Sequence, residues 1–104
     1  MKTILRFEFD QQLFYPEYQG NRNIILEDPS HVPNTGDAVD LEIGEFFEDL
    51  RVVEAFQELT EGQLLIAERL NTRYTRDHVE ILVVLYREDV FKTQFPHLSG
   101  QLSA

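Results

Sequence analysis

Several residue types and sequence patterns are scarce or missing in this chain. It contains no cysteine, which excludes disulfides, thiolate metal sites and a cysteine nucleophile. Its longest apolar run, Ile81 to Tyr86, is far shorter than the roughly 20 residues that span a bilayer. The first ten residues include acids and no sustained apolar stretch, so we expect no signal peptide. These absences predict a soluble, cytoplasmic protein that does not enter a membrane.

Positive charge is also scarce. Nine Lys and Arg residues stand against 19 Asp and Glu residues, which gives a formal net charge of −10. Nucleic-acid binding draws most of its affinity from neutralised phosphates, and the richest basic cluster, Arg69, Arg73 and Arg76, is interleaved with acids. We therefore expect no nucleic-acid partner. The acidity is compatible with solubility alone, with a basic protein partner, or with divalent cations.

Sequence motifs for the commonest cofactors and nucleophiles are missing as well. There is no Walker A sequence and no G-x-G-x-x-G, so a phosphate-binding loop is unsupported. The serines lie in no G-x-S-x-G or S-x-x-K context. We predict no cofactor, and the balance favours a protein that is not an enzyme.

The centre of the fold is predicted between Arg51 and Arg87, where three strand-like segments are separated by two turns. β-branched and large apolar residues alternate in the last of them, at Val79, Ile81, Val83 and Leu85. A turn at Arg76-Asp77 sets Tyr74 opposite Val79, Thr72 opposite Ile81, Leu70 opposite Val83 and Arg73 opposite Glu80. A second turn through Thr60-Glu61-Gly62 sets Phe56 opposite Ile66 and Val52 opposite Leu70. These registers place Val52, Phe56, Leu64, Ile66, Leu70, Tyr74 and the odd residues 79–85 on one face.

Residues 45–59 have an alternative interpretation. Their Glu, Leu, Ala and Gln content suits a helix, with Gly62 as a nearby C-cap. On a helical wheel, however, the apolar residues of this window spread around the circumference, which favours a strand over Arg51 to Glu58. The reverse face of the meander also carries apolar residues, so its centre needs a cover: a helix, a second sheet layer or another copy of the chain.

The remaining elements are read from shorter patterns. Lys2 to Phe9 and Asn23 to Glu27 are expected strands, and Ala38 to Ile43 alternates cleanly with Asp40 and Glu42 outward. Glu88 to Lys92 is expected to continue as a turn or as a single helical turn, with Phe91 and Phe95 as anchors. The 104 residues predict one β-rich domain over residues 1–96 and a flexible tail over 97–104.

One short segment carries a family resemblance. Pro33-x-x-Gly36-Asp37-x-Val39-x-Leu41 resembles the strand entry of small SH3-like β-barrels, where a proline-bearing turn leads through Gly-Asp into an alternating strand. The predicted fold is thus mainly β, or α+β if 45–59 is helical: a small antiparallel meander or an SH3-like, partly open barrel with at most one or two short helices. The resemblance implies binding roles and transfers no catalytic residue.

Three groups of residues are candidates for a functional site. Glu54 and Glu68 fall opposite one another on the apolar face, where paired carboxylates share a proton and support acid–base chemistry. Alternatively, both lie in water at the rim of the sheet or are turned outward by a bulge. The aromatic loop residues Phe14, Tyr15 and Tyr18 form a binding surface or pack onto the core edge. Asp28, His31 and Asp37 are candidates for an oxygen-rich cation site, although Asp commonly hydrogen-bonds its own turn backbone instead.

The leading hypothesis for function is a non-enzymatic protein-interaction module that binds another protein or pairs as a homodimer. A small-ligand or metal-binding barrel, with Glu54 and Glu68 as paired carboxylates of an enzyme, is the first alternative. An acidic DNA mimic that inhibits a nucleic-acid-binding enzyme ranks third, because the acids are spread throughout the chain.

Overall fold

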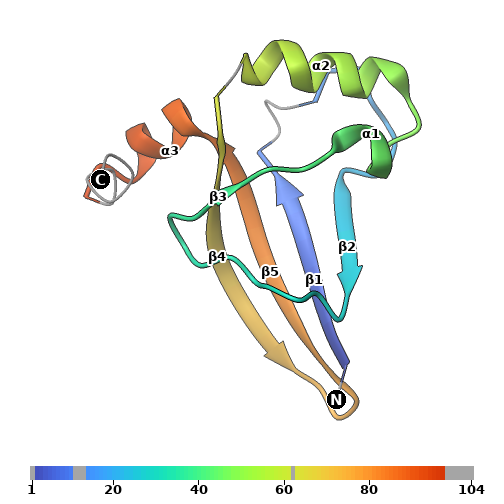
Figure 1. Ribbon diagram of the computed structural model, residues 1–104, viewed down its shortest axis with the longest axis vertical. Helices are drawn as coiled ribbons and strands as arrows, with labels where there is room; N and C mark the ends of the chain where they lie inside the picture. The colour runs from blue at the N-terminus through green and yellow to red at the C-terminus, as the bar shows by residue number, and fades with distance from the viewer. Residues whose placement is uncertain (1, 11–13, 62, 98–104) are drawn as a thin grey trace.

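The structure, a computed structural model, describes residues 2–10, 14–61 and 63–97. Its elements in chain order are β1 (Lys2–Phe9), β2 (Asn23–Glu27), β3 (Ala38–Val39), α1 (Ile43–Phe46), α2 (Leu50–Thr60), β4 (Leu65–Tyr74), β5 (His78–Arg87) and α3 (Glu88–Gln94). Helix α2 lies across one end of the sheet, while the β4–β5 hairpin extends to the other end (Figure 1). Of the predicted tail at 97–104, only His97 lies inside the described residues.

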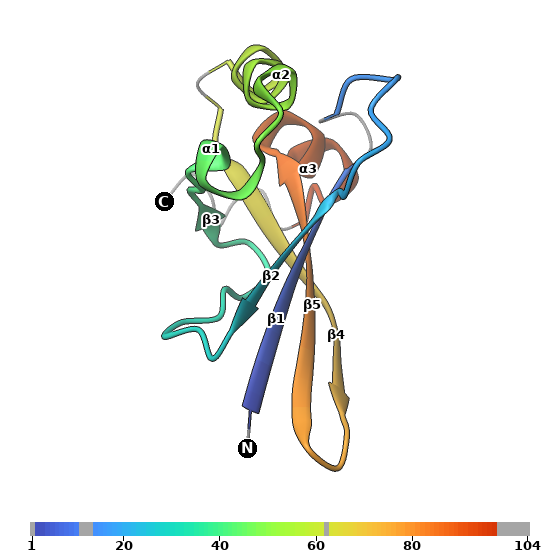
Figure 2. The ribbon, with the colours of Figure 1, turned by 90° about the vertical axis from the view of Figure 1, so that its right-hand side faces the viewer.

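The five strands form one mixed sheet in the order β2-β1-β5-β4-β3. Strands β1 and β5 run parallel, and the other three pairs are antiparallel. The sheet curls into a half-barrel with three short helices (Figure 2). The mainly β, partly open architecture predicted from the sequence is therefore confirmed. The purely antiparallel pairing and the limit of two helices were wrong.

The β4–β5 hairpin follows the predicted register over its outer half. Tyr74 pairs with Val79, Thr72 with Ile81 and Arg73 with Glu80. A register shift between Arg69 and Asn71 then breaks the pattern, and Arg69 instead of Leu70 pairs with Val83. Between this bulge and the start of β4, each side chain points to the opposite face of the sheet from the one predicted. Ala67 is thus buried in the main core, whereas Leu64 and Leu70, expected inside, are 50% and 54% exposed.

The predicted strand over Arg51 to Glu58 was wrong, because these residues belong to helix α2. Asp49 caps the helix by accepting a hydrogen bond from the Arg51 amide at 2.9 Å, and Glu61 ends it in a left-handed conformation. Val52 and Phe56 are buried on one side of the helix. Their predicted cross-strand pairings with Leu70 and Ile66 therefore do not form.

The main core lies between the sheet and helix α2. Alternate residues of β1 and β5 point into it, and aromatic rings fill the end beneath α2. The Phe9 ring packs edge-on against Phe56 and Phe14, with ring centroids 5.1 and 5.6 Å apart. Such edge-to-face pairs contribute beyond the area they bury, roughly 0.5–1.5 kcal/mol each. This aromatic cluster fixes α2 against the sheet.

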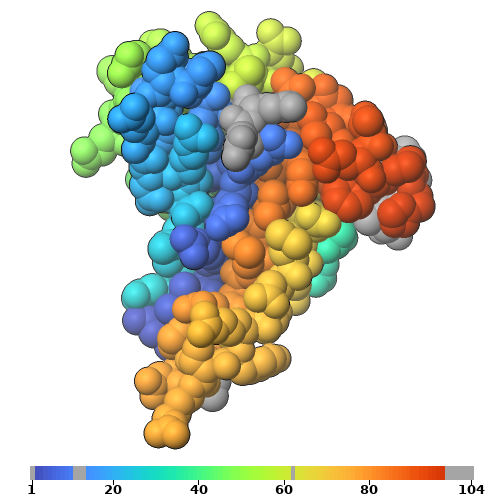
Figure 3. All heavy atoms as spheres, turned by 180° about the vertical axis from the view of Figure 1, so that it is seen from behind, coloured from blue at the N-terminus to red at the C-terminus, as the bar shows by residue number. Residues whose placement is uncertain are grey.

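The reverse face of the sheet is covered in part by α3, one of the covers considered from the sequence. The rings of Phe91 and Phe95 lie 6.3 and 5.8 Å from the ring of Tyr86, and Ile66, paired with Tyr86, is buried. Seen from this side, strands β1, β5 and β4 emerge below α3 (Figure 3). A groove of about 370 Å³ crosses the open part, lined by Ile4, Arg6, Ile25, Asn71, Arg73, Glu80, Ile81 and Leu82.

The segment that resembles an SH3-like strand entry does turn into the sheet. Asp37 donates its amide hydrogen to the Asn34 carbonyl at 3.0 Å, and Gly36 adopts a φ of 95° that suits glycine. The strand that follows is shorter than predicted, since only Ala38 and Val39 pair with β4. The alternation continues without pairing as far as Ile43, where α1 begins.

Candidate functional site

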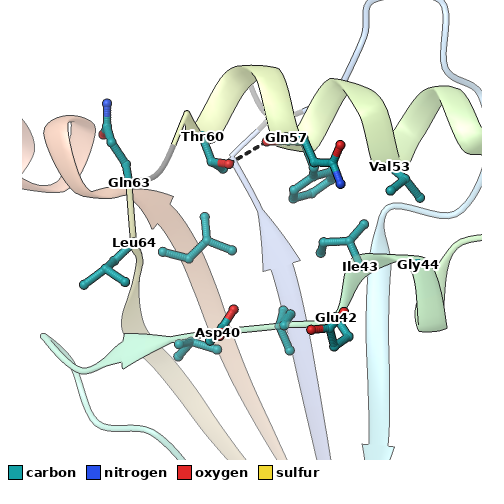
Figure 4. A pocket seen from close by; sticks show the side chains of 13 residues that line it. Asp40, Glu42, Ile43, Gly44, Val53, Gln57, Thr60, Gln63 and Leu64 are labelled. Carbon is teal, nitrogen blue, oxygen red and sulfur yellow. Dashed lines mark hydrogen bonds between the residues drawn. The ribbon is translucent and has the colours of Figure 1, made fainter.

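A groove separates the underside of α2 from the chain that leads from β3 into α1, and its volume is about 310 Å³ (Figure 4). We call it the α2 groove. Val53, Gln57 and Thr60 of α2 face the Asp40–Gly44 segment across it (Figure 4). Its complete lining is Val39, Asp40, Leu41, Glu42, Ile43, Gly44, Val53, Phe56, Gln57, Thr60, Gln63, Leu64 and Leu65.

The alternating sequence after Gly36 builds one wall of this groove. Val39, Leu41 and Ile43 pack against the core, as the alternation predicts, while Asp40 and Glu42 are exposed. An extended chain sends successive side chains to opposite sides, even where it pairs with no strand. This segment therefore gives the groove an apolar floor and places two carboxylates at its rim.

The stretch of chain that borders the groove also carries most of the formal net charge. Between Asp40 and Glu61 there are eight acidic residues and one basic residue, so this stretch has a formal charge of −7 of the total −10. Glu54, Glu58 and Glu61 lie on the exposed side of α2 and its C-cap. Of the acids in this stretch, Asp40 and Glu42 line the α2 groove itself. A field of one sign attracts opposite charge and speeds its association.

The N-terminus of α2 is held by a polar contact from the aromatic loop. The Tyr15 hydroxyl donates to Asp49 Oδ2 at 2.9 Å, and the Arg51 guanidinium lies 5.1 Å from the centre of the Tyr15 ring. The hydrogen bond from Tyr15 lowers the pKa of Asp49, and desolvation, followed by the same bond, raises the pKa of Tyr15. The contact fixes the helix that forms one side of the groove.

The other residues of the aromatic loop are part of the core. Phe14 and Tyr18 are buried and their rings stack with centroids 5.2 Å apart. The Arg22 guanidinium lies over both rings and donates to the Tyr18 carbonyl at 2.8 Å. The structure thus places Phe14 and Tyr18 in packing positions, and Tyr15 is half-buried.

The predicted carboxylate pair is not brought together as a cross-strand pair. Glu54 is exposed on helix α2, and Glu68 pairs with Val84 in the sheet. The Glu68 carboxylate instead accepts a hydrogen bond from the Tyr86 hydroxyl at 3.0 Å. Desolvation, with this hydrogen bond, raises the pKa of Tyr86 to about 12. The pairing failed because its premise, a strand over Arg51 to Glu58, was wrong.

The two aspartates among the candidate cation ligands accept hydrogen bonds from backbone amides. Asp28 Oδ1 accepts from the Thr3 amide at 2.9 Å, and Asp37 Oδ2 accepts from the Asn34 amide at 2.7 Å. His31 is exposed. Among residues 2–10, 14–61 and 63–97, no three His, Cys, Asp or Glu side chains converge as a metal site would require. The Asp37 contact matches the turn-forming role considered for Asp from the sequence, whereas Asp28 bonds strand β1 and not its own turn.

A polar cluster that sequence reasoning missed lies at the tip of the β4–β5 hairpin. His78 Nδ1 lies 3.0 Å from Thr75 Oγ1, and its Nε2 lies 3.0 Å from Glu80 Oε1. This hydrogen bond from His78 is the main cause of the lowered pKa of Glu80. Thr75 Oγ1 also bonds the backbone N–H and C=O of His78, at 3.1 and 3.0 Å. The hydroxyl is therefore engaged in closing the turn. The signal was present in the sequence, since residues two apart on a strand share a face.

No protein-family model, curated protein or solved structure matches this chain. Within the described residues, no helix is long and apolar enough to cross a membrane.

Proposed function

We propose that this protein is an interaction module that binds a basic segment of a partner protein in the α2 groove. The observation that carries the proposal is the combination of an apolar floor with a carboxylate rim. Leu41, Ile43 and Val53 line the groove together with the exposed acids Asp40 and Glu42. A lysine or arginine side chain fits such a surface, because its methylene stem contacts apolar atoms while its charged head meets the rim.

The surrounding charge supports a basic partner over other ligands. The stretch from Asp40 to Glu61 has a formal charge of −7, which repels phosphate-bearing and other anionic ligands and attracts cationic ones. The polar groups of Gln57 and Gln63 are also in the lining. Such groups can hydrogen-bond the backbone of an extended peptide and so fix its position.

The proposal is tested by titrating ¹⁵N-labelled protein with a short peptide in which lysine and leucine alternate. Amide shifts are expected in the segment 39–44 and along α2, and the affinity should fall as salt is added. A peptide with glutamate in place of lysine should leave the spectrum unchanged. Shifts that are dispersed over the whole surface, or that appear equally with both peptides, would contradict the proposal.

Matched variants separate the groove from general acidity. Asp40→Asn with Glu42→Gln should weaken binding about fivefold, since each partly screened ion pair contributes roughly 0.5 kcal/mol. Glu17→Gln with Glu54→Gln removes the same charge from exposed residues outside the lining. This control should bind nearly as well as the wild type. An equal loss in both variants would show that only net charge matters.

A further inference from the structure

Strand β2 lies at one end of the sheet and pairs with β1 along its inner edge. In the view of Figure 2, β2 lies in front of β1, and no helix or strand passes over β2. Edge strands of this kind expose unpaired backbone N–H and C=O groups, which pair readily with a strand from another chain.

The hydrogen-bond pattern shows which groups point outward. The Asp28 amide donates to the Thr3 carbonyl at 2.7 Å, and the residues that bond the neighbouring strand alternate along an antiparallel pair. Leu26 and Ile24 therefore bond β1, while Ile25 and Glu27 point away from it. In the described part of the chain, no hydrogen bond is found for the outward backbone groups of Ile25 and Glu27. Those of Asn23 are occupied by the side chain of Asn21.

This edge lacks several of the features that usually prevent pairing. Its sequence, NIILE, contains no proline and no Lys or Arg, and its register with β1 is unbroken. Ile25 is 57% exposed. The outer half of β4 also has a free edge, but it carries Arg69, Arg73 and a bulge. Of these two edges, β2 is the one suited to strand pairing.

We propose that β2 pairs with β2 of a second copy, antiparallel about a two-fold axis at Leu26. This register sets Ile25 of one copy opposite Glu27 of the other. All four outward backbone groups of each copy are then paired, and the Asn21 contacts are left intact. Leu26 meets Leu26 on the core side of the sheet. The two half-barrels become one continuous ten-stranded sheet, twice the five strands of one copy.

Charge on the edge is compatible with a second copy as the occupant. Glu27 is the one charged residue of β2, and Lys2 lies 3.0 Å from its carboxylate. In the proposed register, Ile25 lies between two cross-strand neighbours, Arg6 of its own copy and Glu27 of the second copy. The net charge of −10 on each copy still opposes dimerisation, because the two copies repel one another. Because salt screens that repulsion, the dimer should strengthen as salt is added. Peptide binding in the α2 groove should weaken under the same conditions.

Sedimentation velocity from micromolar to millimolar protein, at low and at high salt, tests the proposal. The wild type should shift from monomer to dimer with concentration, and more completely at high salt. In the same range, the amide protons of Ile25 and Glu27 should become protected from hydrogen exchange. A monomer throughout, at millimolar protein and high salt, would overturn the proposal.

Two glutamate variants locate the interface. Ile25→Glu should remain monomeric, because the proposed register sets residue 25 opposite Glu27 of the second copy, and like charges directly opposite one another are destabilising. Leu70→Glu changes a similarly exposed residue, 54% against 57%, on the other free edge and should dimerise as the wild type does. Circular dichroism confirms that both variants fold. Loss of the dimer in Leu70→Glu, or its persistence in Ile25→Glu, would assign the contact elsewhere.

Discussion

The Tyr15 hydroxyl donates a hydrogen bond of 2.9 Å to Asp49 Oδ2, joining residues 34 positions apart. The other carboxylate oxygen, Oδ1, accepts from the Arg51 amide at 2.9 Å. One carboxylate thus caps helix α2 and ties the aromatic loop to it. Since α2 forms one side of the α2 groove, this contact links the packing of the loop to the shape of the candidate site.

Replacing Tyr15 with Phe removes this hydrogen bond and keeps the ring. We expect the free energy of unfolding to fall by about 1 kcal/mol, the usual contribution of a single hydrogen bond. Chemical denaturation followed by circular dichroism measures the change. Tyr74→Phe is the matched control, because Tyr74 is 77% exposed, and it should be nearly neutral. Equal effects of the two variants would show that the Tyr15–Asp49 bond adds no stability.

Alkaline pH should destabilise the protein through Tyr86. Its folded-state pKa of about 12 lies above the ordinary value of 10.0, so folding favours the neutral hydroxyl. The stabilisation is complete below pH 10 and is lost as pH rises from about 10 to 12. Melting temperatures recorded over this range should fall more for the wild type than for Tyr86→Phe, which has no proton to lose. Parallel curves would contradict the assignment.

The hairpin tip offers a separate test of the Thr75–His78–Glu80 cluster. Thr75→Val keeps the shape of the side chain but removes its bonds to His78, so we expect a loss of about 1–2 kcal/mol. Thr75→Ser retains the hydroxyl and should recover most of that loss. Hydrogen exchange at the amide of His78, which donates to Thr75 at 3.1 Å, should accelerate in the valine variant alone. Unchanged exchange would show that the turn closes without the hydroxyl.

Local patterns in the sequence were enough to predict β1, β2 and the outer register of the β4–β5 hairpin. They failed over residues 45–59 because two helices meet there. Residues 45 and 46 belong to α1 and residues 50–59 to α2, with a break between them. A single helical wheel over this window mixes the faces of both helices. Taken alone, α2 has an apolar stripe through Val52, Phe56 and Leu59.

The candidate site was harder to predict than the strands. The alternation from Val39 to Ile43 correctly placed Asp40 and Glu42 outward, but it gave no sign that α2 lies opposite them. The bulge between Arg69 and Asn71 was equally hidden, because apolar residues stand on both sides of it in the sequence. Both features depend on contacts between distant segments, which local alternation does not encode.

The parallel pairing of β1 with β5 also constrains when the fold can form. Lys2 pairs with His78 and Phe9 with Leu85, so every pair in this central ladder joins residues 76 positions apart. Such non-local contacts slow folding, because a long loop must close before they are made. On a ribosome, β1 is made before β5, and β2 is the only one of its two partner strands available until β5 emerges. A strand made early is thus completed in the sheet by one made much later.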